Sequence, residues 1–349
     1  MSKARQLADL GNVYDDGALS NRNLIINGAM QVAQRGTSVT GVTTSDFYTC
    51  DRFSLLINTL GSHTLEKDTD APDGFSNSFK IEVTTADASP AAGDYLALEH
   101  KLEGQNLQHL KYGTSSAESV TLSFWVKSNK TGTYIIEWDS NDNSRNINKT
   151  YTVNSSGVWE YKTLTFEGDT VGALDNDSGM SARLFWWLDG GSDFRGGTLA
   201  TSWEATTSAN RAEGNVSFGD TVGNYFQITG VQLEVGDTAT PFEHRSYGDE
   251  LARCKRYYEH IGAEDSIAYI TQSTAAAYGN TVASFGMQCT VEKRASPTLT
   301  IGTLNVFTPS GWDNAIGVVN ASKTNAFFSV TNYSDERLIR GYGTVDAEL

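Results

Sequence analysis

Ser119-Val-Thr-Leu-Ser-Phe-Trp-Val-Lys127 is the stretch of this sequence that most directly decides the fold. Apolar and polar residues alternate along it, and Leu122, Phe124 and Val126 share one side. A period of two is typical of a β-strand that buries one face. The stretch therefore predicts one strand of a layered β-protein.

Similar short stretches continue from residue 23 to residue 247, without a long helical pattern between them. They predict strands at Leu24–Ile26, Cys50–Ile57, Ser78–Val83, Asp94–His100, Thr133–Trp138, Val158–Phe166, Arg183–Leu188 and Tyr225–Val235. Many short strands separated by turns favour a β-sandwich, and the long connection 189–215 suits a jelly roll better than a meander. The predicted fold is all-β, with a jelly-roll β-sandwich over residues 23–247.

The ends of the chain differ from this central part. Residues 1–22 form an N-terminal arm, in which Leu7 and Leu10 share one side of a short amphipathic helix. An arm this short needs a surface to lie on, or else it is a disordered leader. Residues 248–349 are predicted to form a second, smaller β-domain. A short linking helix begins it at Asp249–Arg256, where acidic residues come first and basic residues last.

The charge and composition exclude several classes of partner. The net charge of −16 repels phosphate backbones and anionic membrane surfaces, so binding to nucleic acid or to such a surface is not expected. No apolar run approaches the length of a membrane span, so membrane insertion is not expected either. The N-terminus has no apolar run of signal-peptide length, which predicts a protein made in the cytosol. Cys50, Cys254 and Cys289 are odd in number and widely spaced, so they are expected to be small buried groups.

Two pairs of residues are candidates for a sugar-binding platform. Trp125 and Lys127 lie on the polar side of their predicted strand, opposite Phe124, and Trp159 and Tyr161 share one face of another strand. A flat ring on a polar face is suited to stacking against a pyranose. The alternative is that a loop or a subunit covers these rings, which would make them part of a core or an interface.

Acidic residues raise two further hypotheses. Asp139, Asp142, Asp175 and Asp177 bunch oxygen ligands in loops and are weak candidates for a structural calcium site, with solvated Asx turns as the alternative. No other cofactor is predicted. The five histidines stand singly, and no hydrolase or nucleotide-binding motif is present. Glu99, Glu137 and Asp139 could serve a glycan depolymerase, but the sequence favours a protein that is not an enzyme.

Several segments together resemble a family of marine bacteriophage tail-fibre and virion-surface proteins. They are Asn23-Leu-Ile-Ile-Asn-Gly-Ala-Met-Gln-Val-Ala-Gln-Arg-Gly36, Asp51-Arg-Phe53, Ser123-Phe-Trp-Val-Lys127, Gly230-Val-Gln-Leu-Glu-Val-Gly236, Pro241-Phe-Glu243, Arg253-Cys-Lys-Arg-Tyr-Tyr258, Lys293-Arg-Ala-Ser-Pro-Thr298 and Thr344-Val-Asp-Ala-Glu-Leu349. The resemblance implies a jelly-roll module similar to carbohydrate-binding domains, in a non-enzymatic virion component that takes part in attachment to the host envelope. It also implies assembly in the host cytoplasm, with the arm docking onto other virion proteins of the tail or capsid. The alternative is a glycan-binding protein or a depolymerase that acts on a host surface polysaccharide.

Self-association is the remaining expectation. The resemblance implies a protein that is often trimeric, and the second domain is rich in aromatic residues, which are expected to be exposed. They are Tyr257, Tyr258, Phe307, Trp312, Phe327, Phe328, Tyr333 and Tyr342. Because only residues 1–22 precede the first domain, a short knob or decoration is expected in place of a long fibre.

Overall fold

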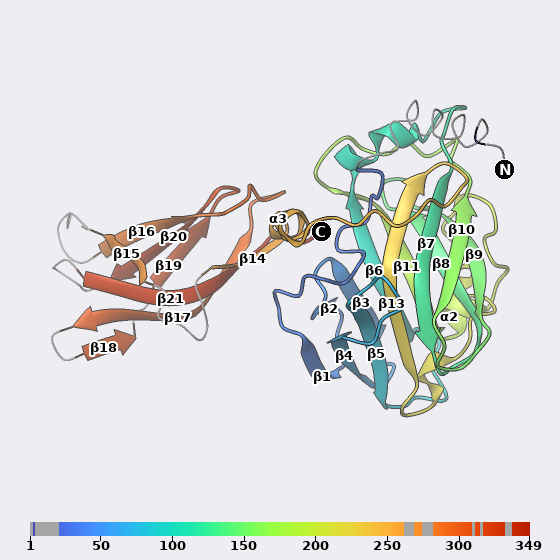
Figure 1. Cartoon of the computed structure of the whole chain (residues 1–349), viewed down its shortest axis with the longest axis horizontal. Coiled ribbons are helices and arrows are strands. Elements are labelled where there is room, and N and C mark those ends of the chain that lie inside the picture. The colour runs from blue at the N-terminus through green and yellow to red at the C-terminus, as the bar shows by residue number, and fades with distance from the viewer. Residues whose placement is uncertain are drawn as a thin grey trace. The chain divides into compact units, whose positions relative to one another are not determined.

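The computed structural model describes residues 21–261, 269–273, 282–308, 311–314, 317–331 and 337–349, together with Lys3. These residues form antiparallel sheets with few and short helices, which confirms the predicted all-β fold. The chain divides into two compact units, Met1–Tyr247 and Gly248–Leu349 (Figure 1). In the described residues, no helix has both the length and the apolar character needed for a membrane span.

The first unit is a sandwich of two antiparallel sheets (Figure 1). The six-stranded sheet contains, in spatial order, β1 (Ser38–Val42), β4 (Ser62–Asp68), β5 (Ser78–Thr85), β13 (Tyr225–Val235), β7 (Val120–Ser128) and β10 (Glu160–Phe166). The seven-stranded sheet contains β12 (Glu204–Ala205), β9 (Arg145–Val153), β8 (Gly132–Ser140), β11 (Met180–Gly190), β6 (Tyr95–Glu103), β3 (Phe53–Asn58) and β2 (Asp46–Phe47). Strands distant in sequence pair side by side, as β13 does with β5 and β7, and this gives the predicted jelly-roll topology.

The core lies between the two sheets and is built by the alternation seen in the sequence. Leu122, Phe124 and Val126 of β7 are fully buried in it, together with Trp186 of β11. The next residue, Trp187, belongs to a smaller apolar cluster on the opposite face of its sheet. The two tryptophans therefore point to opposite faces, as consecutive strand residues must.

Short helical turns connect the strands of the first unit. They are η1 (Gly104–Asn106), η2 (Gln108–Leu110), α2 (Ser192–Arg195), η3 (Ser208–Asn210) and η4 (Phe218–Asp220). The prediction of a strand at Leu24–Ile26 is wrong, because the side chain of Asn23 accepts a hydrogen bond from the backbone N–H of Ile25 at 2.9 Å. A polar side chain that satisfies nearby backbone in this way competes with a sheet ladder.

A β-bulge in β13 changes which residues face the core. Thr229 pairs with Trp125 and Gln232 pairs with Ser123, so two residues of β13 stand opposite Phe124. Gly230, at the first of these two positions, has φ +62°, a conformation that favours glycine. The bulge places Val231 in the core, and Gln232 then faces outward.

The second unit begins with α3 (Tyr247–Lys255), close to the predicted helix. One sheet contains β14 (Tyr258–Ile261), β21 (Arg337–Asp346), β17 (Thr298–Thr308) and β18 (Gly311–Asn314), with β15 (Tyr269–Ser273) also pairing with β21. The other contains β16 (Val282–Gln288), β20 (Asn325–Thr331) and β19 (Gly317–Ala321). A buried ion pair joins Glu259 to Lys293 at 2.6 Å.

The expectation that aromatic residues of this unit are exposed is wrong for two of them. Tyr257 and Tyr258 are buried, because they lead from α3 directly into β14, which pairs with β21. The side chains of Phe307, Trp312, Phe327, Phe328, Tyr333 and Tyr342 lie outside the described part of the structure. All three cysteines are buried, as expected.

Candidate functional site

A groove of about 680 Å³ lies on the outer face of the six-stranded sheet. Its floor consists of side chains from neighbouring strands: Ser123 and Trp125 on β7, and Tyr161 and Thr163 on β10. Trp125 lies opposite the core residues of its strand, as the alternation predicts. The groove is thus formed on the face of the sheet that does not pack against the second layer.

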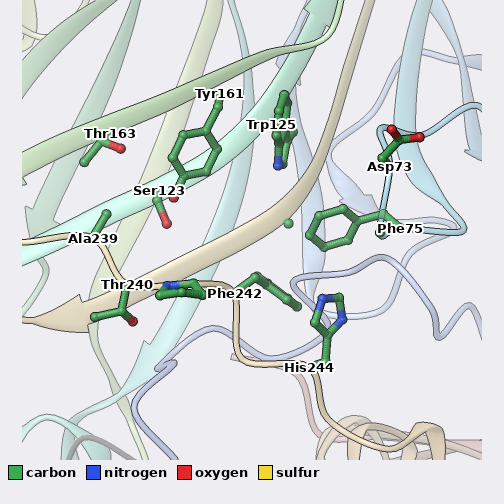
Figure 2. A pocket seen from close by; sticks show the side chains of 13 residues that line it. Asp73, Phe75, Ser123, Trp125, Tyr161, Thr163, Ala239, Thr240, Phe242 and His244 are labelled. Atoms are coloured by element: carbon green, nitrogen blue, oxygen red, sulfur yellow. The ribbon is translucent and has the colours of Figure 1, made fainter. Parts of the chain in front are cut away.

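Two aromatic rings form the centre of the floor (Figure 2). Tyr161 is the register partner of Trp125, and their ring centroids lie 5.3 Å apart with planes inclined at 51°. The Tyr161 side chain is 46% exposed, which is high for a large ring. Side chains directly opposite on adjacent strands are near neighbours, so the pairing of β7 with β10 fixes the two rings beside each other.

The facing wall is also aromatic, although it comes from two loops (Figure 2). Phe75 belongs to the loop between β4 and β5, and Phe242 and His244 belong to the segment after β13. The Phe75 ring centroid lies 5.0 Å from that of Phe242 and 5.3 Å from that of His244, and Phe242 and His244 are 4.9 Å apart. These edge and tilted contacts stabilise the three rings as one cluster.

Gly230 allows floor and wall to approach each other. A Cβ atom at this position would lie 2.7 Å from Cζ of Phe75 and 3.1 Å from Cδ1 of Trp125. The separation of 2.7 Å between a Cβ atom and Cζ of Phe75 is too short for any real side chain, so the Phe75 ring would have to move. The bulge glycine is therefore required twice, for its positive φ and for the space that it leaves to the two rings.

Outward-facing polar residues of β13 hold the loop that carries Phe242. The carboxylate of Glu234 accepts hydrogen bonds from Thr240 N–H at 2.8 Å and from the Thr240 hydroxyl at 2.6 Å. The side-chain oxygen of Gln232 accepts a hydrogen bond from Glu243 N–H at 2.8 Å. Because these partners are mostly buried, the loop is fixed in place before any ligand binds.

The start of the described chain supports the same loop. The carboxylate of Glu243 accepts hydrogen bonds from the backbone N–H groups of Asn21 and Asn23, at 2.6 and 2.9 Å. Arg245 donates to the carbonyl oxygens of Ile25, at 2.9 Å, and Asn23. Burial would raise the pKa of Glu243, but these hydrogen bonds and the nearby arginines hold it below its usual value. The segments that begin and end the sandwich are thus joined beside the groove.

Lys127 and Trp159 lie next to the groove but do not line it. Both bind Asp70: the Lys127 ammonium is 2.5 Å from one carboxylate oxygen, and Trp159 Nε1 donates to the other at 3.2 Å. Partial burial would raise the pKa of Asp70, but these donors hold it below its usual value. Of the predicted sugar platform, Trp125 and Tyr161 therefore come together, whereas Lys127 and Trp159 form a separate polar cluster.

The structure does not gather the candidate calcium ligands into one site. Asp139 pairs with Arg183 at 2.7 Å, Asp142 accepts the N–H of Asp175, and Asp177 accepts the N–H of Gly179 two residues on, as in an Asx turn. No group of three His, Cys, Asp or Glu side chains that could hold a metal ion is found within the described ranges. The calcium site therefore stays a prediction that this arrangement of carboxylates does not support.

The acids considered for catalysis belong to a buried ionic network on the seven-stranded sheet. Arg183 contacts Asp139 and, at 3.4 Å, Glu99, while Arg211 lies 2.8 Å from Glu137. Burial raises the pKa of Glu137, and the adjacent Arg211 acts in the opposite direction. All three carboxylates are almost completely buried, so they hold the sheet and its covering loop together.

Sequence reasoning missed the facing wall, Phe75, Phe242 and His244. A signal for it was present, since a glycine inside the β13 pattern indicates a bulge or a close approach. Leu7 and Leu10, the candidate docking residues, lie outside the described residues.

No protein-family model matches the chain, and no curated protein matches it either. Solved structures that match part of the chain include the enzymatically active domain of bacteriophage CBA120 tailspike protein 4, at 12% identity and a TM-score of 0.30, covering 61% of this chain and 21% of that one. A CBM4 carbohydrate-binding module matches at 14% identity and a TM-score of 0.30, over 60% of this chain and 97% of the module. A C-terminal family 22 carbohydrate-binding module of Clostridium thermocellum matches at 10% identity and a TM-score of 0.31, over 64% and 98%.

Proposed function

We propose that this protein is a non-enzymatic glycan-binding protein, and that the groove on the six-stranded sheet holds the saccharide. The observation that carries the proposal is the two-sided aromatic groove, with Trp125 and Tyr161 facing the Phe75 cluster. Pyranose rings present C–H faces that pack against aromatic rings, and their hydroxyls need polar partners at the edges. Ser123, Thr163 and Thr240 supply such hydroxyls along the lining.

The chemistry of the lining favours binding over cleavage. Glycoside hydrolysis generally requires two carboxyl groups on either side of the scissile bond. Of the described residues that line the groove, only Asp73 carries a carboxylate. A depolymerase is the alternative, and a direct assay for cleavage separates the two.

We propose further that the glycan belongs to a host surface, and that the protein is a structural component of a phage virion. The segments that carry the resemblance to phage virion proteins support this, because several of them build the groove. Gly230, Gln232 and Glu243 shape or hold its wall, and Asn23 fastens the start of the chain to it. In this proposal the N-terminal arm, through Leu7 and Leu10, anchors the protein to the particle.

A glycan array combined with a reducing-sugar release assay tests the proposal. The full-length protein is expected to bind a saccharide without releasing reducing ends, and Trp125→Ala should weaken binding at least about tenfold, or ~1.4 kcal/mol. Tyr247→Ala is the control, since this exposed ring does not line the groove. Release of reducing ends would favour the depolymerase, and binding that Trp125→Ala leaves unchanged would place the site elsewhere.

The oligomeric state and the location are proposals as well. We expect a homotrimer, so light scattering at micromolar concentration should give three times the chain mass of 37.9 kDa. A monomer under these conditions would refute it. A density map of the particle would show whether the chain lies on its surface and what the arm contacts.

A further inference from the structure

We infer that the groove selects glycans without negative charge and that Asp73 sets this selectivity. The inference rests on the proposed function and specifies its ligand class: neutral pyranose units, as opposed to uronic acids or sulfated or phosphorylated sugars. It follows from the charges around the groove, which are unevenly distributed.

The described lining of the groove has one carboxylate, Asp73, and one histidine, His244. It contains no lysine or arginine, and its carboxylate, Asp73, is exposed at the edge of the groove (Figure 2). No hydrogen bond or ion pair joins Asp73 to another residue in the described part of the chain. Its charge is therefore not neutralised by the protein.

Cations close to the groove are already engaged by carboxylates. Lys127 pairs with Asp70, Arg22 with Glu234, and Arg245 with Glu243. An ammonium or guanidinium held in such a pair contributes little attraction to a further anion. Among the described residues that line the groove, Asp73 is consequently the carboxylate whose charge acts directly on a bound ligand.

An anionic sugar would meet three unfavourable effects in this groove. Its charge would lose water against aromatic rings without gaining a lysine or arginine partner, which is costly. The faces of those rings carry partial negative charge, and Asp73 adds direct repulsion. A neutral sugar meets none of these effects, so the groove discriminates by rejecting the wrong ligand.

The experiment uses pairs of polysaccharides with the same backbone, one member neutral and one with charged substituents. Suitable probes are dextran with dextran sulfate, hydroxyethylcellulose with carboxymethylcellulose, and carrageenan oligosaccharides after and before chemical desulfation, measured by calorimetry on the full-length protein. For any pair that binds, the neutral member is expected to bind at least about tenfold more tightly. Asp73→Asn should reduce the ratio of neutral to anionic affinity about threefold, and Asp73→Lys should reduce this ratio further. Added salt should reduce the same ratio in the wild type.

Asp193→Asn is the matched control, because it removes the same charge from the exposed Asp193 in α2, outside the groove. Asp193→Asn should leave the ratio of neutral to anionic affinity unchanged. The inference would be overturned if the anionic and neutral members bind within about threefold of each other, or if Asp73→Asn does not alter the ratio of their affinities. Either outcome would leave glycan binding itself intact. Failure of every probe and of the wider array to bind would refute the proposed function, and the inference with it.

Discussion

Replacing Gly230 by alanine tests whether the bulge glycine holds the two sides of the groove together. The new Cβ atom would lie 2.7 Å from Cζ of Phe75, so the Phe75 ring must move away. That movement disrupts its contacts with Phe242 and His244, which have centroid distances of 5.0 and 5.3 Å. Each aromatic pair contributes about 0.5–1.5 kcal/mol, so losing both costs about 1–3 kcal/mol.

The backbone adds a second cost, which a control can remove. At φ +62° an alanine is strained by about 1–2 kcal/mol. Gly41→Ala carries the same strain, because Gly41 has φ +70°, and a Cβ atom there meets nothing within 4 Å. The difference between the two variants therefore isolates the contact with Phe75. Gly230→Ala should be less stable than Gly41→Ala by about 1–3 kcal/mol.

Urea unfolding followed by tryptophan fluorescence measures this difference, since Trp125 lies beside the altered contact. The chain has two units, so the comparison uses the transition of the first unit in both variants. Only Gly230→Ala should also weaken ligand binding. If the two variants unfold at the same urea concentration and bind equally well, Gly230 does not position Phe75 and the account of the groove is wrong.

Two further predictions concern buried ionisable groups. Burial lowers the pKa of His63 from 6.5 to about 4, so the unfolded chain takes up a proton at a higher pH than the folded chain does. The free energy of unfolding should therefore fall by up to about 3 kcal/mol as the pH drops from about 6.5 to about 4. In His63→Leu the midpoint of urea unfolding should depend less on pH across this window than it does in the wild type. A slope in His63→Leu as steep as in the wild type would contradict this assignment. Lys293→Met should destabilise the second unit by about 3–5 kcal/mol in calorimetry, because it removes the nearer, fully buried cation from the buried Glu259 carboxylate. Lys255→Met removes the other cation of Glu259, which lies 3.5 Å away with 24% side-chain exposure, and should cost less than about 1 kcal/mol. Equal losses in the two variants would show that burial does not distinguish these pairs.

The sequence predicted the outward direction of Trp125 and Tyr161, two of the four proposed platform residues, because strand alternation is a local property. Once β7 exists, Phe124 must face the core and Trp125 must face away from it. The same rule places Trp186 and Trp187 on opposite faces of β11. A period of two therefore gave both the fold class and the orientation of the central ring.

Strands with few apolar residues were not predicted. In β9 (Arg145–Val153), Ile147 faces the core, but Asn146 and Asn148 are also fully buried on the other face. The side chain of Asn148 donates to backbone oxygens of residues 210 and 211 at 3.1 and 2.8 Å, so it is satisfied inside the protein. Hydrophobic patterns cannot reveal a face that is buried through hydrogen bonds.

The wall of the groove could not be derived from sequence because its contacts join distant segments. Phe75 meets Phe242 only after β5 and β13 pair, and that pairing carries no local signal. The polar neighbours of the platform show the same difficulty. Lys127 had the predicted outward direction, but its partner, Asp70, lies in the loop between β4 and β5, far away in the sequence.

The hydrogen bonds between the two ends of the sandwich have a mechanical consequence. The backbone N–H groups of Asn21 and Asn23 donate to Glu243, and Arg245 donates to the backbone carbonyls of Asn23 and Ile25. These hydrogen bonds join the segments that enter and leave the first unit. Tension applied to the two ends of this unit would therefore act on these hydrogen bonds first. They lie next to Phe242 and His244 in the chain, so their rupture would displace the wall of the groove.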